Sequence, residues 1–250
     1  FHDKDDSDAW IDDKGKFNAD RTNDSELANS AYIAAANGLT IASVEPGQYQ
    51  RNPDPPFTTD TLLMKAGSDM GWNPRRTMKV AGELYNAGHI TYMRTDSTRT
   101  NKGAREDVKA HIRERWGEDH LGKGVLGPDA KSDASNVQDA HEAIRPTRPN
   151  VGSPEGLSAE QARLYRLIWA RFAGSQMNPS RYERFSMTAQ ADGFNRHFSG
   201  TASWRIHRGW EAAFEGIRKE PATAPPSFDA SIGTALTLDN AEVDSENPCL

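Results

Sequence analysis

The sequence predicts an α+β protein in which a helical domain is inserted into a β-rich domain. Residues 1–55 contain short stretches of strand-like alternation, residues 56–182 show helical spacing of apolar side chains, and alternation returns over residues 183–250. We therefore expect both ends of the chain to build one β-rich domain. Within the helical domain, two helices followed by a strand resemble a winged helix, an arrangement common in DNA-binding proteins and also elsewhere.

The first 55 residues are expected to hold two strands and a helix. The strands are predicted over residues 9–11 and 40–44, and the helix lies between Ser25, as its cap, and Gly38, as its stop. The run Asn-Pro-Asp-Pro-Pro at residues 52–56 removes backbone donors and stiffens the chain. We place the domain boundary there.

Helices are expected to dominate the middle of the chain. One is predicted over residues 59–70, closed by Gly71, and Asn73 caps the next, which has Pro at its first position. The buried stripe of this second helix is expected to be Thr77, Val80, Ala81 and Leu84. A short strand over residues 89–94 and then a helix over residues 102–116 are expected to follow.

The last hundred residues are expected to change from helix to strand. A capping box that begins at Ser158 starts one more helix. A period of two then marks strands over residues 185–189 and 198–206, joined by a hairpin turn at Asp-Gly 192–193. A final strand is expected over residues 231–238.

Composition argues against a membrane-spanning or disulfide-stabilised protein. No apolar run approaches the roughly 18–20 residues that a membrane span needs. The single cysteine, Cys249, cannot form an internal disulfide, so a reduced cytoplasmic setting is expected. The chain opens on Phe1 without an initiator Met or a signal peptide, which predicts a fragment or a processed chain.

Charge is unevenly distributed along the chain. The net charge of −6 argues against nucleic acid as a partner, and residues 1–60 carry 12 acidic and 5 basic side chains. Residues 72–117, however, carry 10 basic and 5 acidic side chains. Because salt screens charges beyond about 10 Å, this local basic region is what a phosphate backbone would meet. An ordinary solvated helix surface explains the same pattern equally well.

The residues best suited to chemistry lie in Ile-Thr-Tyr-Met-Arg-Thr-Asp-Ser at residues 90–97. On a strand, Tyr92 and Arg94 would point the same way, about 6–7 Å apart along the backbone. A phenol with an ordinary pKa near 10 is only about 0.1% ionised at pH 7, a shortfall of roughly 4 kcal/mol. A guanidinium on the same face would favour the phenolate and pair with phosphate oxygens. Taken alone, such a pair is more often structural.

A second polar stretch, Gln-Asp-Ala-His-Glu-Ala-Ile-Arg-Pro-Thr, covers residues 138–147. If it is helical, His141 and Arg145 share a face, although Pro146 disfavours helical geometry at Arg145. Histidine can donate to a phosphate oxygen or transfer a proton near neutral pH. Alone, the stretch is more simply a polar helix end.

Together the two stretches closely resemble type IA DNA topoisomerases. Met93 favours the bacterial DNA topoisomerase I branch, because other branches often carry Pro there. Further segments match the family in register, namely residues 56–62, 84–88, 164–169, 176–177, 198–200 and 209–210. The resemblance is strong over about residues 55–215. Gly82 and Asn86 depart from the family, which usually has Gln and Glu at these positions.

The resemblance implies that this chain is the central, strand-cleaving part of a DNA-relaxing isomerase that needs no ATP. Residues 56–182 would carry the active-site tyrosine, and residues 1–55 and 183–250 would form a β-rich arch. Tyr92 would form a 5′-phosphotyrosyl link to one broken strand, with Arg94 and His141 on the scissile phosphate. The residues implied in DNA contact are Thr91, Arg94, Thr95, His141 and Arg145. Asp96 would help to place the tyrosine or meet a neighbouring domain.

The resemblance also implies partners and a cofactor that lie outside these residues. The partners would be single-stranded DNA and the remaining domains of the same polypeptide, with no membrane, at the nucleoid. Mg²⁺ would be bound by a TOPRIM domain, which is not visible in the sequence, so residues 1–250 alone are expected not to relax supercoils. No metal is expected in this chain, because the clustered aspartates Asp3, Asp5, Asp6 and Asp8 lack strand-end context.

Two rival functions follow from the same residues. A winged-helix DNA-binding module without chemistry would use Tyr92 only structurally. A relaxase or a tyrosine recombinase would also use a tyrosine, but the histidines lack the spacing of a metal cluster, and Tyr92 precedes His141 and Arg145 instead of coming last.

Overall fold

The computed structural model describes residues 9–11, 17–22, 24–125, 142–225, 227 and 231–237 of the 250. His141, Cys249 and the N-terminal aspartate cluster lie outside the described residues. Contacts divide the chain into two units. The first comprises Phe1–Gln48, Glu183–Trp204 and Ala224–Leu250, and the second comprises Tyr49–Tyr182 and Arg205–Thr223. Residues 205–223 thus group with the helices, whereas we expected them in the β-rich domain.

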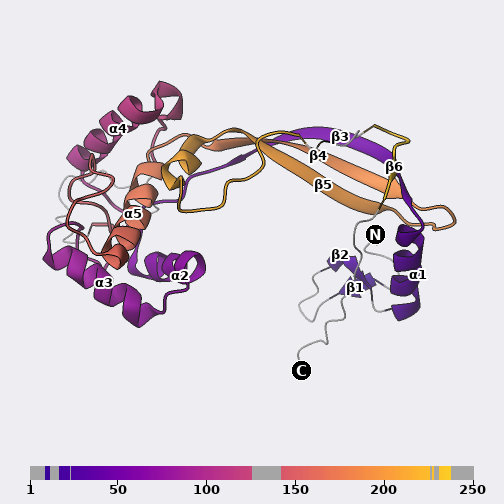
Figure 1. Ribbon diagram of the computed structural model, residues 1–250, viewed down its shortest axis with the longest axis horizontal. Helices are drawn as coiled ribbons and strands as arrows, with labels where there is room; N and C mark the ends of the chain where they lie inside the picture. Colours follow the sequence, from indigo (N-terminus) through magenta and orange to yellow (C-terminus); the bar gives the residue numbers. More distant parts are fainter. Residues whose placement is uncertain are drawn as a thin grey trace. The chain divides into compact units, whose positions relative to one another are not determined.

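The expectation of an α+β protein is confirmed by a mixture of helices and an antiparallel sheet (Figure 1). The helices are α1 (Ser25–Ala36), α2 (Thr59–Met70), α3 (Pro74–Asn86), α4 (Lys102–Trp116) and α5 (Ala159–Gly174), with short 3-10 helices η1 (Glu118–His120) and η3 (Gly209–Phe214). The strands are β1 (Ala9–Ile11), β2 (Phe17–Thr22), β3 (Leu39–Arg51), β4 (Ser180–Gln190), β5 (Phe198–His207) and β6 (Ala235–Leu236). In the described part of the chain, no helix is both long and apolar enough to cross a membrane.

The larger sheet has the strand order β5-β4-β3-β6, and β1 pairs with β2 separately. Side chains paired across β3 and β4 show that these strands run antiparallel, since Ser43 meets Thr188 and Gln48 meets Glu183. The hairpin turn predicted between β4 and β5 is confirmed, with Gly193 at a φ of +77°. The final strand is shorter than predicted, because only two residues of β6 pair with the start of β3.

The strand predicted over residues 40–44 is also too short, because β3 continues to Arg51. In sequence, Pro46-Gly47 indicates a turn. In the structure the extended backbone passes through both residues, and a Cβ on Gly47 would lie 3.2 Å from Nε of Arg184 on β4. The glycine therefore makes room for an arginine side chain on the neighbouring strand.

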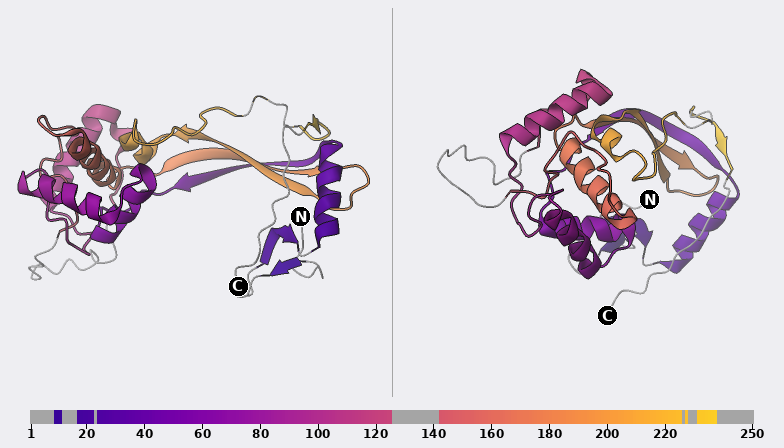
Figure 2. Two further views of the ribbon diagram at one scale, coloured as in Figure 1. Left: turned by 60° about the horizontal axis from the view of Figure 1, so that its bottom comes forward. Right: turned by 60° about the vertical axis from the view of Figure 1, so that its left-hand side comes forward.

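The helices of the second unit begin and end where their caps predict. Asn73 caps α3, with Pro74 at its first position, and the capping box of Ser158 and Gln161 starts α5. In the first unit, Asp24 instead of Ser25 caps α1. The predicted buried stripe of α3 is confirmed at all four positions. The packing around it is dense, because α5 is buried over most of its length against α3, α4 and η3 (Figure 2).

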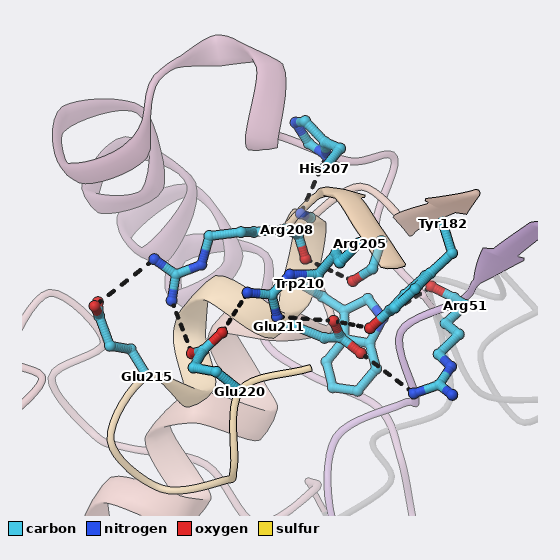
Figure 3. A network of polar contacts seen from close by, with 11 residues as sticks. Arg51, Tyr182, Arg205, His207, Arg208, Trp210, Glu211, Glu215 and Glu220 are labelled. Atoms are coloured by element: carbon cyan, nitrogen blue, oxygen red, sulfur yellow. Dashed lines mark hydrogen bonds and ion pairs between the residues drawn. The ribbon is translucent and has the colours of Figure 1, made fainter. Parts of the chain in front are cut away.

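A polar network fixes the ends of β3, β4 and β5 that belong to the second unit (Figure 3). Tyr182 donates a hydrogen bond to Glu211 at 2.5 Å, and Arg205 donates to the same carboxylate at 3.2 Å. Arg205 also pairs with Glu220, while the Arg51 guanidinium lies 4.8 Å from the centre of the Tyr182 ring. Burial alone would lower the pKa of Arg205, but the two carboxylates raise it above its ordinary value. The network pairs this buried charge with two carboxylates, those of Glu211 and Glu220.

Replacement of Leu84 by alanine tests the packing of α3. Leu84 is fully buried in the core of the second unit, so Leu84→Ala is expected to lower the free energy of unfolding by about 2–5 kcal/mol. Urea unfolding of the chain, followed by tryptophan fluorescence, measures the change. Met64→Ala on α2 is the matched control, because Met64 is 74% exposed and its loss is expected to cost less than about 0.5 kcal/mol. Equal losses would contradict this packing.

Candidate active site

The segment that carries Tyr92 is irregular, with bends at residues 89, 91 and 93, so the strand predicted over residues 89–94 is wrong. After α3 the chain turns at Gly88, where φ is +74°, and makes one isolated β-bridge between Ile90 and Pro146. A regular strand does not form, because the segment that contains Pro146 pairs with Ile90 at that residue only. Two residues earlier, Ile144 forms its β-bridge with Phe57 instead. The winged-helix-like order of helix, turn, helix and strand is therefore incomplete in this part of the described chain.

The two polar stretches singled out in the sequence meet in the structure. The backbone N–H of Thr91 donates to the Arg145 carbonyl at 2.9 Å, and the N–H of Thr147 donates to the His89 carbonyl at 3.0 Å. The Thr91 hydroxyl donates to the Ala143 carbonyl at 2.7 Å and accepts from the Arg145 N–H at 2.9 Å. Described residues 142–146 are extended rather than helical, so the helical face considered for Arg145 is not formed.

A second threonine holds the other side of the tyrosine. Thr59, the first residue of α2, donates from its hydroxyl to the Met93 carbonyl at 2.8 Å and accepts from the Thr95 N–H at 2.9 Å. Its own N–H donates to the Thr95 carbonyl at 2.8 Å. In the sequence, Thr59 is predicted only as the start of a helix and as part of a segment that matches the family. Nothing in the local pattern indicates that its hydroxyl would reach a backbone 34 residues away.

Side chains along this segment alternate between solvent and interior. Tyr92, Arg94 and Asp96 are exposed, whereas Met93 is half-buried and Thr95 is buried. The alternation of an extended chain thus survives without a strand, which leaves the phenol and the guanidinium both open to solvent. Among the described residues, the Arg94 guanidinium has no hydrogen bond or ion pair, and it is free to meet an anion.

Two other tyrosines, Tyr165 and Tyr182, are less suited to act as a nucleophile. Tyr165 is buried and donates to the Val151 carbonyl at 2.7 Å, and burial raises its pKa to about 12. Burial, together with the hydrogen bond to Glu211, also raises the pKa of Tyr182. Tyr92, by contrast, is 44% exposed. Its ring contacts that of Tyr85 edge-to-face, at 5.3 Å between ring centres.

The other described residues that were predicted to contact DNA form hydrogen bonds within the protein. The Arg145 side chain is 12% exposed, pairs with Glu142 at 2.5 Å and donates to the Pro146 carbonyl at 2.9 Å. The Thr91 hydroxyl bonds the backbone, and the Thr95 hydroxyl accepts from the Ser97 N–H at 3.1 Å. These groups hold the segment in place. A phosphate that approached from solvent would contact the exposed Arg94 before it contacted any of them.

Part of the positive charge predicted over residues 72–117 is compensated in the structure. Four of its ten basic side chains form ion pairs with acidic ones, namely Arg76–Glu160, Lys79–Glu83, Lys109–Glu106 and Arg113–Glu118. Within the described residues, Arg75, Arg94, Lys102 and Arg115 are exposed and have no such pair. Across the described residues, no group of three or more His, Cys, Asp or Glu side chains could hold a metal ion.

Comparison with known proteins shows the family to which the chain belongs. A family model described as DNA topoisomerase matches residues 2–247. The chain is 41% identical over 159 residues to the prokaryotic-type DNA topoisomerase 1 of Acanthamoeba polyphaga mimivirus, covering 63% of this chain and 18% of that protein. It is 37% identical over 171 residues to DNA topoisomerase 1 of Escherichia coli, covering 67% of this chain and 19% of that protein.

A solved structure shows the same fold. Full-length topoisomerase I from Thermotoga maritima superposes with a TM-score of 0.66 at 32% identity, covering 92% of this chain and 36% of that one. The chain belongs to the type IA DNA topoisomerase family, as its motifs predicted. It spans about a fifth to a quarter of the length of most of the curated relatives that it matches.

Replacement of Thr91 by valine tests whether its hydroxyl holds the tyrosine segment. Valine keeps the shape but leaves the Ala143 carbonyl and the Arg145 N–H without their partner, which is expected to cost about 1–3 kcal/mol of unfolding free energy. Thr91→Ser keeps the hydroxyl and serves as the control. Urea unfolding compares the two variants, and a serine variant as unstable as the valine variant would refute the assigned role of the hydroxyl.

Proposed function

We propose that this chain is the strand-cleaving part of a type IA DNA topoisomerase and that Tyr92 is its nucleophile. The observation that carries the proposal is an exposed phenol on a backbone held from both sides. Thr91 is bonded to residues 143–145 on one side, and the Met93 carbonyl is bonded to Thr59 on the other. Two residues further along, Arg94 is also exposed, and its guanidinium has no ion pair among the residues that the structure describes.

The proposed reaction is a reversible transesterification. The Tyr92 phenol oxygen attacks the phosphorus of a DNA phosphodiester, so that a phosphotyrosyl bond forms while the bond to the 3′ oxygen breaks. The proton lost by the phenol is balanced by the one that the released 3′ hydroxyl gains. Arg94 would pair with the non-bridging phosphate oxygens as negative charge builds up. Because the ester keeps the energy of the broken bond, the reverse reaction reseals the strand without ATP.

Anchoring the backbone while leaving the side chain exposed suits this chemistry. A nucleophile gains rate when its attacking atom is held close to the line of attack. Backbone bonds to Thr59 and to residues 143–147 supply that constraint without burying the phenol. Burial would raise the pKa of the phenol and so reduce the nucleophilic form, as the pKa of Tyr165 illustrates.

The remaining features of the intact enzyme are part of the same proposal. The second unit would be the tyrosine-bearing domain and the sheet of the first unit an arch, with winged-helix-like packing around α2 and α3. The partners would be single-stranded DNA and further domains of the same polypeptide, and His141 would contact the phosphate. Because it acts on DNA, the enzyme would be located in the cytoplasm, at the nucleoid. Mg²⁺ would be held by a TOPRIM domain outside residues 1–250.

Tyr92→Phe in the complete polypeptide is expected to abolish covalent capture of a single-stranded oligonucleotide. Phenylalanine lacks the oxygen that forms the ester, while binding of the oligonucleotide should persist. A denaturing gel detects the adduct, and fluorescence anisotropy measures binding.

Tyr32→Phe is the matched control, because Tyr32 is 42% exposed, much as Tyr92 is, but lies on α1 in the first unit. Its adduct yield is expected to match that of the unsubstituted enzyme. Residues 1–250 alone, assayed in parallel, are expected to form no adduct. An adduct that persists in Tyr92→Phe would show that the chain binds DNA without using this tyrosine.

A further inference from the structure

Tyr85 is placed beside the nucleophile by the last turn of α3. Its ring centre lies 5.3 Å from that of Tyr92 with an interplanar angle of 63°, an edge-to-face arrangement that aromatic pairs prefer. The Tyr85 side chain is nevertheless 41% exposed, so it does not fill the core. Within the described residues its hydroxyl has no hydrogen-bond partner either. Among the described residues, the ring of Tyr85 interacts with the ring of Tyr92.

The helix that carries Tyr85, α3, is anchored in the core of the second unit. Leu84, the preceding residue, is fully buried, as is Ala81 one turn earlier, and both belong to the core of the second unit. The ring of Tyr85 is therefore carried by a fixed element rather than by a loop. The neighbouring helix position, Gly82, has no side chain, and a Cβ there would lie 3.6 Å from Cε of Met93. On this face of α3, Gly82 offers no side chain to the tyrosine segment, and the ring of Tyr85 contacts Tyr92.

The Tyr92 ring needs such a contact because its backbone anchors do not fix its side chain. Hydrogen bonds at Thr91, Met93 and Thr95 restrain the main chain on both sides. The exposed side chain keeps its rotamer freedom unless something packs against the ring. Since in-line attack requires the phenol oxygen to be held in one direction, free rotation would reduce the productive fraction.

We propose that Tyr85 is a positioning residue, which holds the Tyr92 ring in the rotamer that attacks DNA. The proposal rests on the proposed function of Tyr92. Tyr85 acts through its ring and not through its hydroxyl, because the contact is between rings. It is required for the rate of cleavage once DNA is bound, and it is not required for binding.

A different role would be direct stacking of Tyr85 on a nucleobase. Aromatic side chains in single-strand binding proteins stack on bases, and their loss weakens binding. The two roles affect different quantities, since positioning changes the rate at saturating DNA, whereas stacking changes the dissociation constant. The edge-to-face contact with Tyr92 favours positioning.

The test uses the complete polypeptide and a single-stranded oligonucleotide, with single-turnover cleavage measured at saturating DNA. Tyr85→Ala and Tyr85→Leu are expected to slow cleavage by roughly 3- to 10-fold, the rate ratio that corresponds to one lost edge-to-face contact. Tyr85→Phe keeps the ring and is expected to restore the rate. The dissociation constant should be the same for all three variants. Tyr32→Ala, which removes a tyrosine of similar exposure from α1, should leave both quantities unchanged.

Distinct outcomes separate this inference from the function on which it rests. An unchanged cleavage rate in both Tyr85→Ala and Tyr85→Leu would overturn the positioning role. Weaker binding with an unchanged saturating rate would also overturn it, in favour of a stacked base. A slow Tyr85→Phe variant would mean that the hydroxyl and not the ring is needed. In all of these cases Tyr92→Phe still forms no adduct, whereas an adduct in Tyr92→Phe would refute the proposed function itself.

Discussion

Two threonine hydroxyls hold the irregular segment on which this site is built. The segment after α3 forms a single isolated bridge, at Ile90, and so lacks the repeated ladder that keeps a strand straight. Two threonines replace that ladder. Thr59 bonds backbone groups of residues 93–95, and Thr91 bonds backbone groups of residues 143–145. Each hydroxyl both donates and accepts, so each joins two main-chain groups at once. They add to the main-chain hydrogen bonds at His89, Thr91 and Thr95, which join the segment to the same neighbours.

This arrangement would reconcile two opposing demands on a tyrosine that acts as a nucleophile, as we propose for Tyr92. A nucleophile must be reachable by a large substrate, which favours exposure, and it must also be held in one direction, which favours packing. Here the main chain is hydrogen-bonded on both sides, the side chain is 44% exposed, and the Tyr85 ring contacts it. The helix that carries Tyr85, α3, packs against α5. Arg94, which has no ion pair among the described residues, would supply charge on the exposed side, whereas Arg145 is paired with Glu142.

The helices of the second unit could be predicted because their signals are local. Asn73 and Ser158 cap their helices as expected, and the apolar spacing of α3 identified its buried face. The errors concern partners distant in sequence. The strand predicted over residues 40–44 was too short because β4, which extends its pairing, lies far along the chain. Residues 89–94 resembled a strand because alternation alone does not show how much of a partner segment is available to pair. The contacts of the Thr59 hydroxyl, with backbone groups 34 and 36 residues away, have no local signal. The family, in contrast, was recognised from its motifs and is confirmed.

The most direct measurement is to locate the amino acid that carries the broken strand. The complete polypeptide would be incubated with a single-stranded oligonucleotide, denatured, digested with a protease and a nuclease, and analysed by mass spectrometry. The account predicts a residual phosphonucleotide on the peptide containing Tyr92, attached through the 5′ phosphate. A nucleotide adduct on Tyr85 or on any other residue, with Tyr92 unmodified, would contradict it.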